Sequence, residues 1–188
     1  MAFDKDLDLA FISHSKDFFL RFQQQLEVLE KIFSEVANAF PQKKLLAYHD
    51  QAKGSKLSKG NKLEGLPYQV LDLIRDFDTE SGFNIRFLHW WGKGFFVFVT
   101  YGNQKKNLKI LNQSAKWKGF NFSLSASPFN YSKIIESPRL IGHLEAKALA
   151  SSKHQLQIWK KIDMNKSAFV MAESLLKLTE DILSYHGD

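Results

Sequence analysis

Residues 83–101, FNIRFLHWWGKGFFVFVTY, decide the fold of this chain. Eight of these 19 residues are aromatic, whereas 14% of the whole chain is aromatic. Large aromatic and β-branched side chains favour strands, and Gly92, Lys93 and Gly94 interrupt the apolar run. Because glycine accepts the positive φ that the first position of a type II′ turn requires, the stretch predicts a β-hairpin with a two-residue turn at Gly92-Lys93.

This turn sets the expected register of the hairpin. It pairs Trp90 with Phe95 and Phe87 with Phe98, and it leaves both faces apolar near the turn. A sheet with one solvent-exposed face alternates apolar and polar residues instead. We therefore expect helices or loops over both faces of the hairpin, or a pocket on one of them.

The segment before the hairpin adds a third strand. Residues 67–75 fit either one face of a helix or a buried strand, because both patterns suit a short apolar run. Segments adjacent in sequence often pair, and the polar residues 76–82 are typical of a turn into the hairpin. We therefore predict an antiparallel meander of strands at 67–75, 83–91 and 94–101.

Two segments after the hairpin extend this sheet. Residues 120–126 alternate apolar and polar side chains, as a strand with one solvent-exposed face does. Residues 154–162 alternate in the same way and are a candidate fifth strand, which the lysines at 160 and 161 place at an edge. Residues 128–136 are predicted to be a loop. The whole pattern predicts a single-domain α+β fold with a central antiparallel sheet of four or five strands.

Apolar periodicity predicts three helices around this sheet. The longest, 15–40, has apolar side chains at spacings of three and four along its whole length, and Pro41 ends it. We expect its apolar stripe to pack on the sheet. The alternative is that this helix forms a dimeric coiled coil. Shorter helices are predicted at 138–150 and 165–186, and residues 1–12 are a candidate arm that docks as an extra strand.

Composition restricts the class of protein. At 188 residues one domain is expected, and the absence of cysteine excludes disulfides, thiolate metal sites and a cysteine nucleophile. The first residues lack the basic start and apolar core of a signal peptide, and no apolar run is long enough to span a bilayer. We therefore expect a cytoplasmic protein without a membrane partner.

Much of the net charge of +6 lies in one segment. Residues 42–64 hold several lysines among glycines and serines, and we predict a flexible loop there. The glycine spacing does not match the phosphate-binding loop G-x4-G-K-[ST]. The candidate contacts to a polyanion are Lys53, Lys56, Lys59 and Lys62.

The polar residues within the aromatic hairpin are the candidate site. Arg86 and His89 stand among apolar side chains, and a buried guanidinium needs a carboxylate partner because an unpaired one is costly. Aromatic walls with few polar groups are typical of ligand pockets. We therefore predict a cleft that binds a small or acidic ligand through Arg86, His89, Trp90, Trp91 and Lys93.

Two alternatives rest on other chemistry. One is a nucleic-acid-binding module, in which the lysines of residues 43–62 meet phosphates and exposed tryptophans stack on bases. The other is an enzyme in which Asp72 or Asp76 acts with His89, since imidazole titrates near neutral pH. The first alternative is not favoured, because the lysines lie in one segment and the chain has only four arginines.

The sequence contains no recognised catalytic motif. It lacks the G-x-S-x-G nucleophile elbow and the G-x-G-x-x-G cofactor fingerprint. His49 and Asp50 are adjacent, and sequence neighbours rarely orient each other as a base and its partner. We therefore predict no catalytic residue, no metal site and no cofactor, and we favour a binding protein over an enzyme.

Overall fold

The computed structural model describes residues 6–104, 114–141 and 154–186. It has one six-stranded sheet in the order β1-β2-β3-β4-β6-β5, and every neighbouring pair is antiparallel. The fold is therefore α+β and built on an antiparallel sheet, as predicted. The strands are β1 (Lys56–Leu63), β2 (Leu66–Arg75), β3 (Phe83–Trp90), β4 (Gly94–Tyr101), β5 (Asn121–Ser123) and β6 (Leu156–Ile162).

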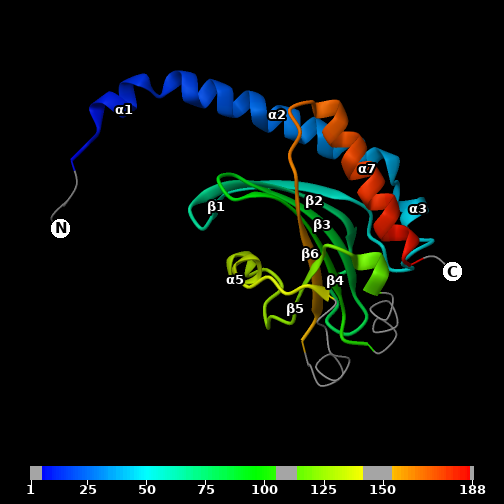
Figure 1. Ribbon diagram of the computed structural model, residues 1–188. Coiled ribbons are helices and arrows are strands. Elements are labelled where there is room, and N and C mark those ends of the chain that lie inside the picture. The colour runs from blue at the N-terminus through cyan, green and yellow to red at the C-terminus, as the bar shows by residue number, and fades with distance from the viewer. Residues whose placement is uncertain (1–5, 105–113, 142–153, 187–188) are drawn as a thin grey trace.

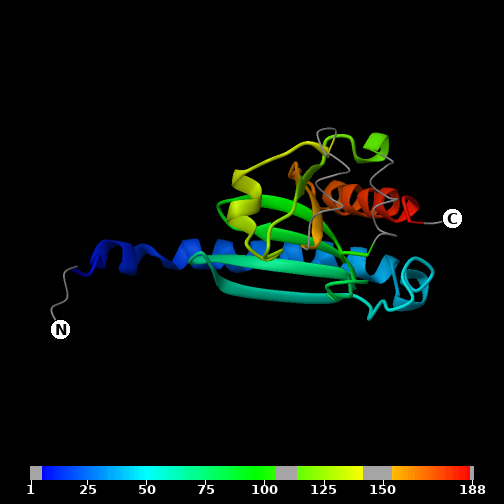
Figure 2. The same cartoon turned by 90° about the horizontal axis from the view of Figure 1, so that it is seen from below.

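The helices lie on both faces of this sheet, which is strongly arched (Figure 1). α2 and α7 cover the convex face, and α5 lies inside the arch on the concave face. Figure 2 shows that α2 runs along the sheet and then continues well beyond it with α1. In the described part of the chain, no helix is long and apolar enough to cross a membrane. The helices are α1 (Leu9–His14), α2 (Lys16–Ala39), α3 (Gln42–Leu45), the 3-10 helix η1 (Ser114–Trp117), α5 (Tyr131–Glu136) and α7 (Ala168–Ser184).

Apolar side chains are buried on both faces, which confirms the expectation from the hairpin. On the convex face, Leu29, Phe33 and Val36 of α2 belong to one large apolar cluster. The cluster also contains buried residues of α7 and the sheet residues that face α2 and α7. A smaller cluster on the concave face consists of Val70, Leu88, Trp90, Phe96, Phe98, Tyr131, Ile134 and Trp159. The sheet is thus the middle of three layers.

The hairpin register differs by one residue from the predicted one. Trp90 pairs with Gly94, so the turn has three residues, and Gly94 has a φ of 134° that favours glycine. This register also places Thr100 opposite Asn84 and beside Gln157 on the concave face. The predicted register would have put Thr100 against an apolar neighbour, so the polar residues of the concave face decide between the two turns.

The lysine-rich segment is not the loop that we predicted. Residues 42–64 contain α3 and the edge strand β1, which pairs with β2 alone, and residues 46–55 between them lie in neither element. Charged side chains are typical of an edge strand, and their polar pattern hid the strand in the sequence.

Four other expectations need correction. The segment 154–162 forms β6, which lies between β4 and β5 and not at an edge. β5 is shorter than predicted and pairs only with residues 157–159, so the lysines at 160 and 161 still lie where one side of β6 is free. The predicted arm 1–12 contains the start of α1 and no described strand, and the predicted loop 128–136 contains α5.

The remaining helices can be compared in part. The long helix and the last helix are confirmed as α2 and α7. Most of the predicted helix 138–150 lies outside the described residues.

One buried ion pair ties the concave face together. Arg86 Nε lies 2.6 Å from Asp72 Oδ1 and Arg86 Nη2 lies 2.8 Å from Asp72 Oδ2, across the β2–β3 pair. Arg86 Nη1 also donates to the Tyr131 hydroxyl of α5. The rings of Phe77 and Phe129 lie 5.5 and 5.3 Å from the guanidinium carbon. Burial lowers the pKa of Arg86, but hydrogen bonding and charge from Asp72 and Tyr131 outweigh it and raise that pKa above its usual value.

We expect Asp72→Asn to lower the free energy of unfolding by about 3–5 kcal/mol, because it leaves the Arg86 guanidinium without its charged partner. The matched control is Lys59→Gln, which breaks the exposed 3.2 Å pair with Glu30 and should cost less than about 1 kcal/mol. Urea denaturation monitored by circular dichroism measures both. A loss for Asp72→Asn as small as that of the control would contradict this role.

Candidate functional site

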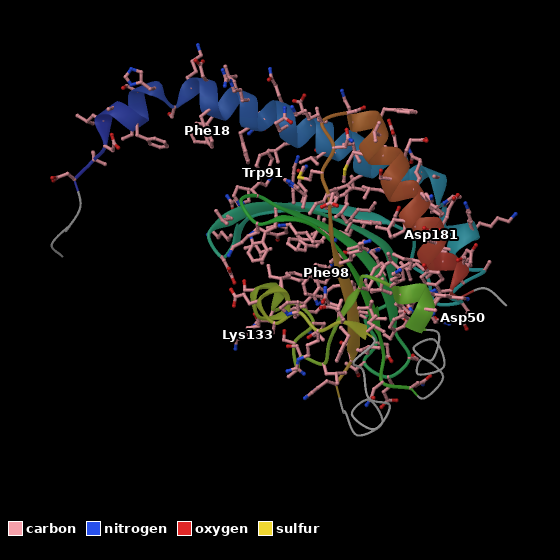
Figure 3. The ribbon with its side chains drawn as sticks, in the orientation of Figure 1. Phe18, Asp50, Trp91, Phe98, Lys133 and Asp181 are labelled. Atoms are coloured by element: carbon pink, nitrogen blue, oxygen red, sulfur yellow. The ribbon has the colours of Figure 1, made fainter. Side chains whose placement is uncertain are left out.

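The five predicted ligand residues divide between the two faces of the sheet. Alternation along β3 places Arg86 and Trp90 on the concave face and His89 on the convex face. Trp91, the first residue of the turn, lies between α2 and the sheet (Figure 3). Lys93 lies in the turn, with its ammonium 5.5 Å from the Trp90 ring. The structure therefore joins His89 and Trp91 but not all five residues in one cleft.

A cavity of about 160 Å³ lies on the convex face, where β3 ends beneath α2 and the start of α7. His89 and Trp91 both line it, and their rings meet edge to face with centroids 5.1 Å apart. Phe22 of α2 packs on Trp91, with the centroids 4.6 Å apart. The other lining residues are apolar (Val28, Leu29, Ile32, Ala168, Met171 and Met164) or polar (Gln25, Asn165 and Lys166).

Two residues that line this cavity carry buried polar atoms without partners. His89 is only 5% exposed, and its Nδ1 has no hydrogen-bond partner among the described residues. The indole Nε1 of Trp91 is also buried without a partner. Gln69 lies opposite His89 on β2 and lines a different cavity; its Nε2 donates to the Leu26 carbonyl at 2.9 Å, and its Oε1 has no partner in the part of the chain that the structure describes. Since each such group costs about 1–3 kcal/mol, the cluster is a candidate ligand site.

The positive groups beside the cavity are Lys166 and the start of α7, and the imidazole is not one of them. Burial lowers the pKa of His89 to about 4, so the ring is neutral at pH 7 and has one donor and one acceptor nitrogen. α7 begins at its cap Ser167, whose hydroxyl accepts from the Val170 N–H at 3.4 Å. The first turn of a helix leaves further N–H groups unpaired and carries partial positive charge, and Lys166 lies beside it.

Sequence reasoning missed the contribution of α7. The serine at 167 before an apolar periodic run is a signal for a helix start, but the sequence does not place that start over β3. Gln69 gave no signal either, because a single glutamine in an apolar strand is ordinary.

The predicted grouping of Asp72 or Asp76 with His89 is wrong. Asp72 is paired with Arg86 on the concave face, opposite to His89. Asp76 Oδ2 lies 2.7 Å from His49 Nε2, so it pairs with a histidine other than the predicted one.

The His49–Asp76 pair has the geometry of a base held by a carboxylate, but neither residue lines any of the three described cavities. In the described ranges, no three His, Asp or Glu side chains are grouped to hold a metal ion.

The four predicted polyanion contacts do not share a surface. Lys56 and Lys59 are three residues apart in β1, so alternation directs them to opposite faces. Lys59 reaches Glu30 of α2 on the convex side. Lys53 lies before the strand and Lys62 beyond a register shift near its end, and both are exposed. The arrangement gives phosphates no continuous basic strip.

We expect stability to fall as the pH is lowered from 6.5 to about 4. The ordinary histidine pKa of 6.5 falls to about 4 for His89 and also for His186 in the folded protein, chiefly through burial. The unfolded state therefore binds more protons in this window, and the full contribution is present only above pH 6.5. For His89 the contribution is roughly 3 kcal/mol. Urea denaturation across this range should show a flatter decline for His89→Gln than for wild type, and parallel declines would contradict the burial of a neutral imidazole.

Comparison of the sequence with protein-family models and with curated proteins gives no match, and comparison of the structure with solved structures gives none either.

Proposed function

We propose that the protein binds a small carboxylic acid with an apolar or aromatic tail in the cavity that His89 and Trp91 line. The observation that carries this proposal is the pair of buried, unpartnered nitrogens, His89 Nδ1 and Trp91 Nε1, at one small cavity. A ligand that supplies hydrogen-bonding oxygens would offset the cost of these groups.

The size and walls of the cavity support an apolar tail. Its volume of about 160 Å³ is close to the ~150 Å³ of an engineered cavity that holds benzene. Leu29, Ile32 and Met171 are almost fully buried and give it an apolar wall. A ring or a chain of a few carbons fills this space, whereas a nucleotide does not.

The groups at the α7 end of the cavity support a carboxylate head. The indole N–H of Trp91 is a donor only, and the N-terminal end of α7 and the Lys166 ammonium favour negative charge. The Asp72 and Asp76 carboxylates are both engaged elsewhere. The neutral His89 ring can either donate or accept one further hydrogen bond.

We expect benzoate to raise the melting temperature in a concentration-dependent way, and benzyl alcohol to bind at least tenfold more weakly. Stabilisation by mass action explains the first effect, and the loss of a charge-assisted hydrogen bond worth about 1.5–3 kcal/mol explains the second. Thermal melts and isothermal titration calorimetry measure the two. Equal affinity for both probes would show that the cavity has no preference for an acid.

The variants Trp91→Phe and Lys166→Gln separate this site from other places on the protein. Each should weaken benzoate binding by roughly tenfold or more, since each removes one partner of the carboxylate. Lys160→Gln is the matched control, because Lys160 is an exposed lysine away from the cavity. If benzoate affinity does not change in Trp91→Phe, the cavity is not the binding site.

A further inference from the structure

The N-terminal helical segment carries an apolar surface that the rest of the described chain leaves largely uncovered. We call residues 7–22, which comprise α1 and the first part of α2, the projecting segment. It extends beyond the sheet in both views (Figures 1 and 2). Its exposed apolar residues are Leu7 (77%), Leu9 (69%), Phe11 (60%), Ile12 (54%), Phe18 (60%), Phe19 (52%) and Leu20 (53%).

The stripe that packs on the sheet continues into the projecting segment without a change of phase. Leu29, Ile32 and Val36 of α2 are buried at spacings of three and four. Toward the N-terminus the same alternation passes through Phe22, Phe18, Ser15 and Phe11. Ser15 is a turn residue between α1 and α2 with backbone angles in the right-handed helical region, so Phe18 and Phe22 share one side of α2 and Phe11 lies one turn further along on α1. An alternation of three and four is the pattern of a helix–helix seam.

The opposite side of the helix changes in character where it leaves the sheet. Beside the sheet this side carries Glu27, Glu30 and Ser34, which face solvent as expected. In the projecting segment the same side carries Leu9, Ile12, Phe19 and Leu20. Exposed apolar residues therefore lie on more than one side of the projecting segment, which is typical of an interaction surface.

The exposed area fits a protein interface. An aromatic side chain has an area of about 150–250 Å². At their exposed fractions, Phe11, Phe18 and Phe19 together therefore leave roughly 350 Å² exposed. The four exposed aliphatic residues add to this area. Summed over both sides of the helix, these residues expose more apolar area than the roughly 300–600 Å² of the largest patch on an ordinary monomer. This area approaches the roughly 800 Å² per partner of a stable complex.

The charges distinguish a protein partner from a lipid surface. The projecting segment carries Asp8 and Asp17 against Lys16 and Arg21, so its polar positions have both signs and no excess of cations. A helix that lies on a membrane surface instead has a polar face rich in lysine and arginine.

We infer that the projecting segments of two copies of this chain pair antiparallel and form a homodimer. An axis between residues 16 and 17 places Phe18 of one copy opposite the small Ser15 of the other, and Phe11 opposite Phe22. The Phe18–Ser15 contacts then lie at the centre of the seam, and the Phe11–Phe22 contacts lie at its ends. The end of each α1 lies over the Phe22–Trp91 contact of the other copy, which is where the sheet stops covering α2.

Sedimentation equilibrium of the full chain at micromolar concentration tests this inference. We expect a mass of twice 21.7 kDa for the wild type and of one chain for Phe18→Glu. Phe18 is exposed in the single chain, so the Phe18→Glu variant should still fold. Circular dichroism and thermal melts of the variant check this. The matched control is Phe169→Glu, which introduces the same charge at a phenylalanine that is 71% exposed on α7 and should leave the dimer intact.

The absence of cysteine makes the orientation testable. Phe11→Cys and Phe22→Cys, mixed and oxidised, should give a disulfide between the two variants, whereas a parallel pair would give each variant linked to itself. A monomeric wild type would overturn the inference. So would wild-type protein that floats with phosphatidylcholine–phosphatidylserine vesicles while Phe18→Glu does not, because that result assigns the surface to a membrane.

Discussion

The buried Asp72–Arg86 pair is the constraint on which the two sides of this sheet depend. Removing a guanidinium from water is costly unless its partner is in place, and here the partner lies directly across the β2–β3 pair. A slip of one residue would move Arg86 to the convex face, among the apolar side chains beneath α2. The pair therefore selects the register, and through Tyr131 it also fixes α5 within the arch.

Because the Asp72–Arg86 pair lies on the concave face, the convex face can hold the cavity. On the concave face, Asn84 donates to Asp72, and Gln157 donates to Thr100 and to a backbone carbonyl, although Gln157 Oε1 and Trp159 Nε1 are buried there without partners among the residues that the structure describes. On the convex face, in contrast, His89 and its neighbours remain unpaired beside a space of molecular size. Unpaired polar atoms that border an open cavity can be reached by a ligand, and this is the reason to assign binding to the convex face.

Much of the fold could be predicted because local sequence and burial agree. The aromatic hairpin, the stripe of α2 and the alternation in 154–162 each follow from one periodicity. The register could not be predicted, because Gly92-Lys93-Gly94 suits a two-residue and a three-residue turn equally, and the choice depends on Thr100 meeting polar neighbours on other strands. β1 was not predicted from the sequence, because a strand with a single neighbour tolerates polar side chains.

The candidate site was predicted only in part for a similar reason. His89 and Trp91 stood out as polar or aromatic residues near a turn, but the α7 end that completes the cavity lies more than 70 residues further along the chain. The His49–Asp76 pair was missed because its members are 27 residues apart. Such groupings follow from topology, and no spacing in the sequence contains them.

The two outer strands of the sheet have a consequence for how the protein assembles. β1 carries exposed lysines and a register shift, and β5 is only three residues long, so neither offers a long, flat row of free backbone groups. An assembly that grows by adding strands at a sheet edge does not close and can form fibres. Two identical helices that meet about a twofold axis bury the same surface on both copies, so that assembly is closed at two copies. The edge strands thus offer little surface for open-ended growth, and the inferred pairing of two projecting segments would close on itself.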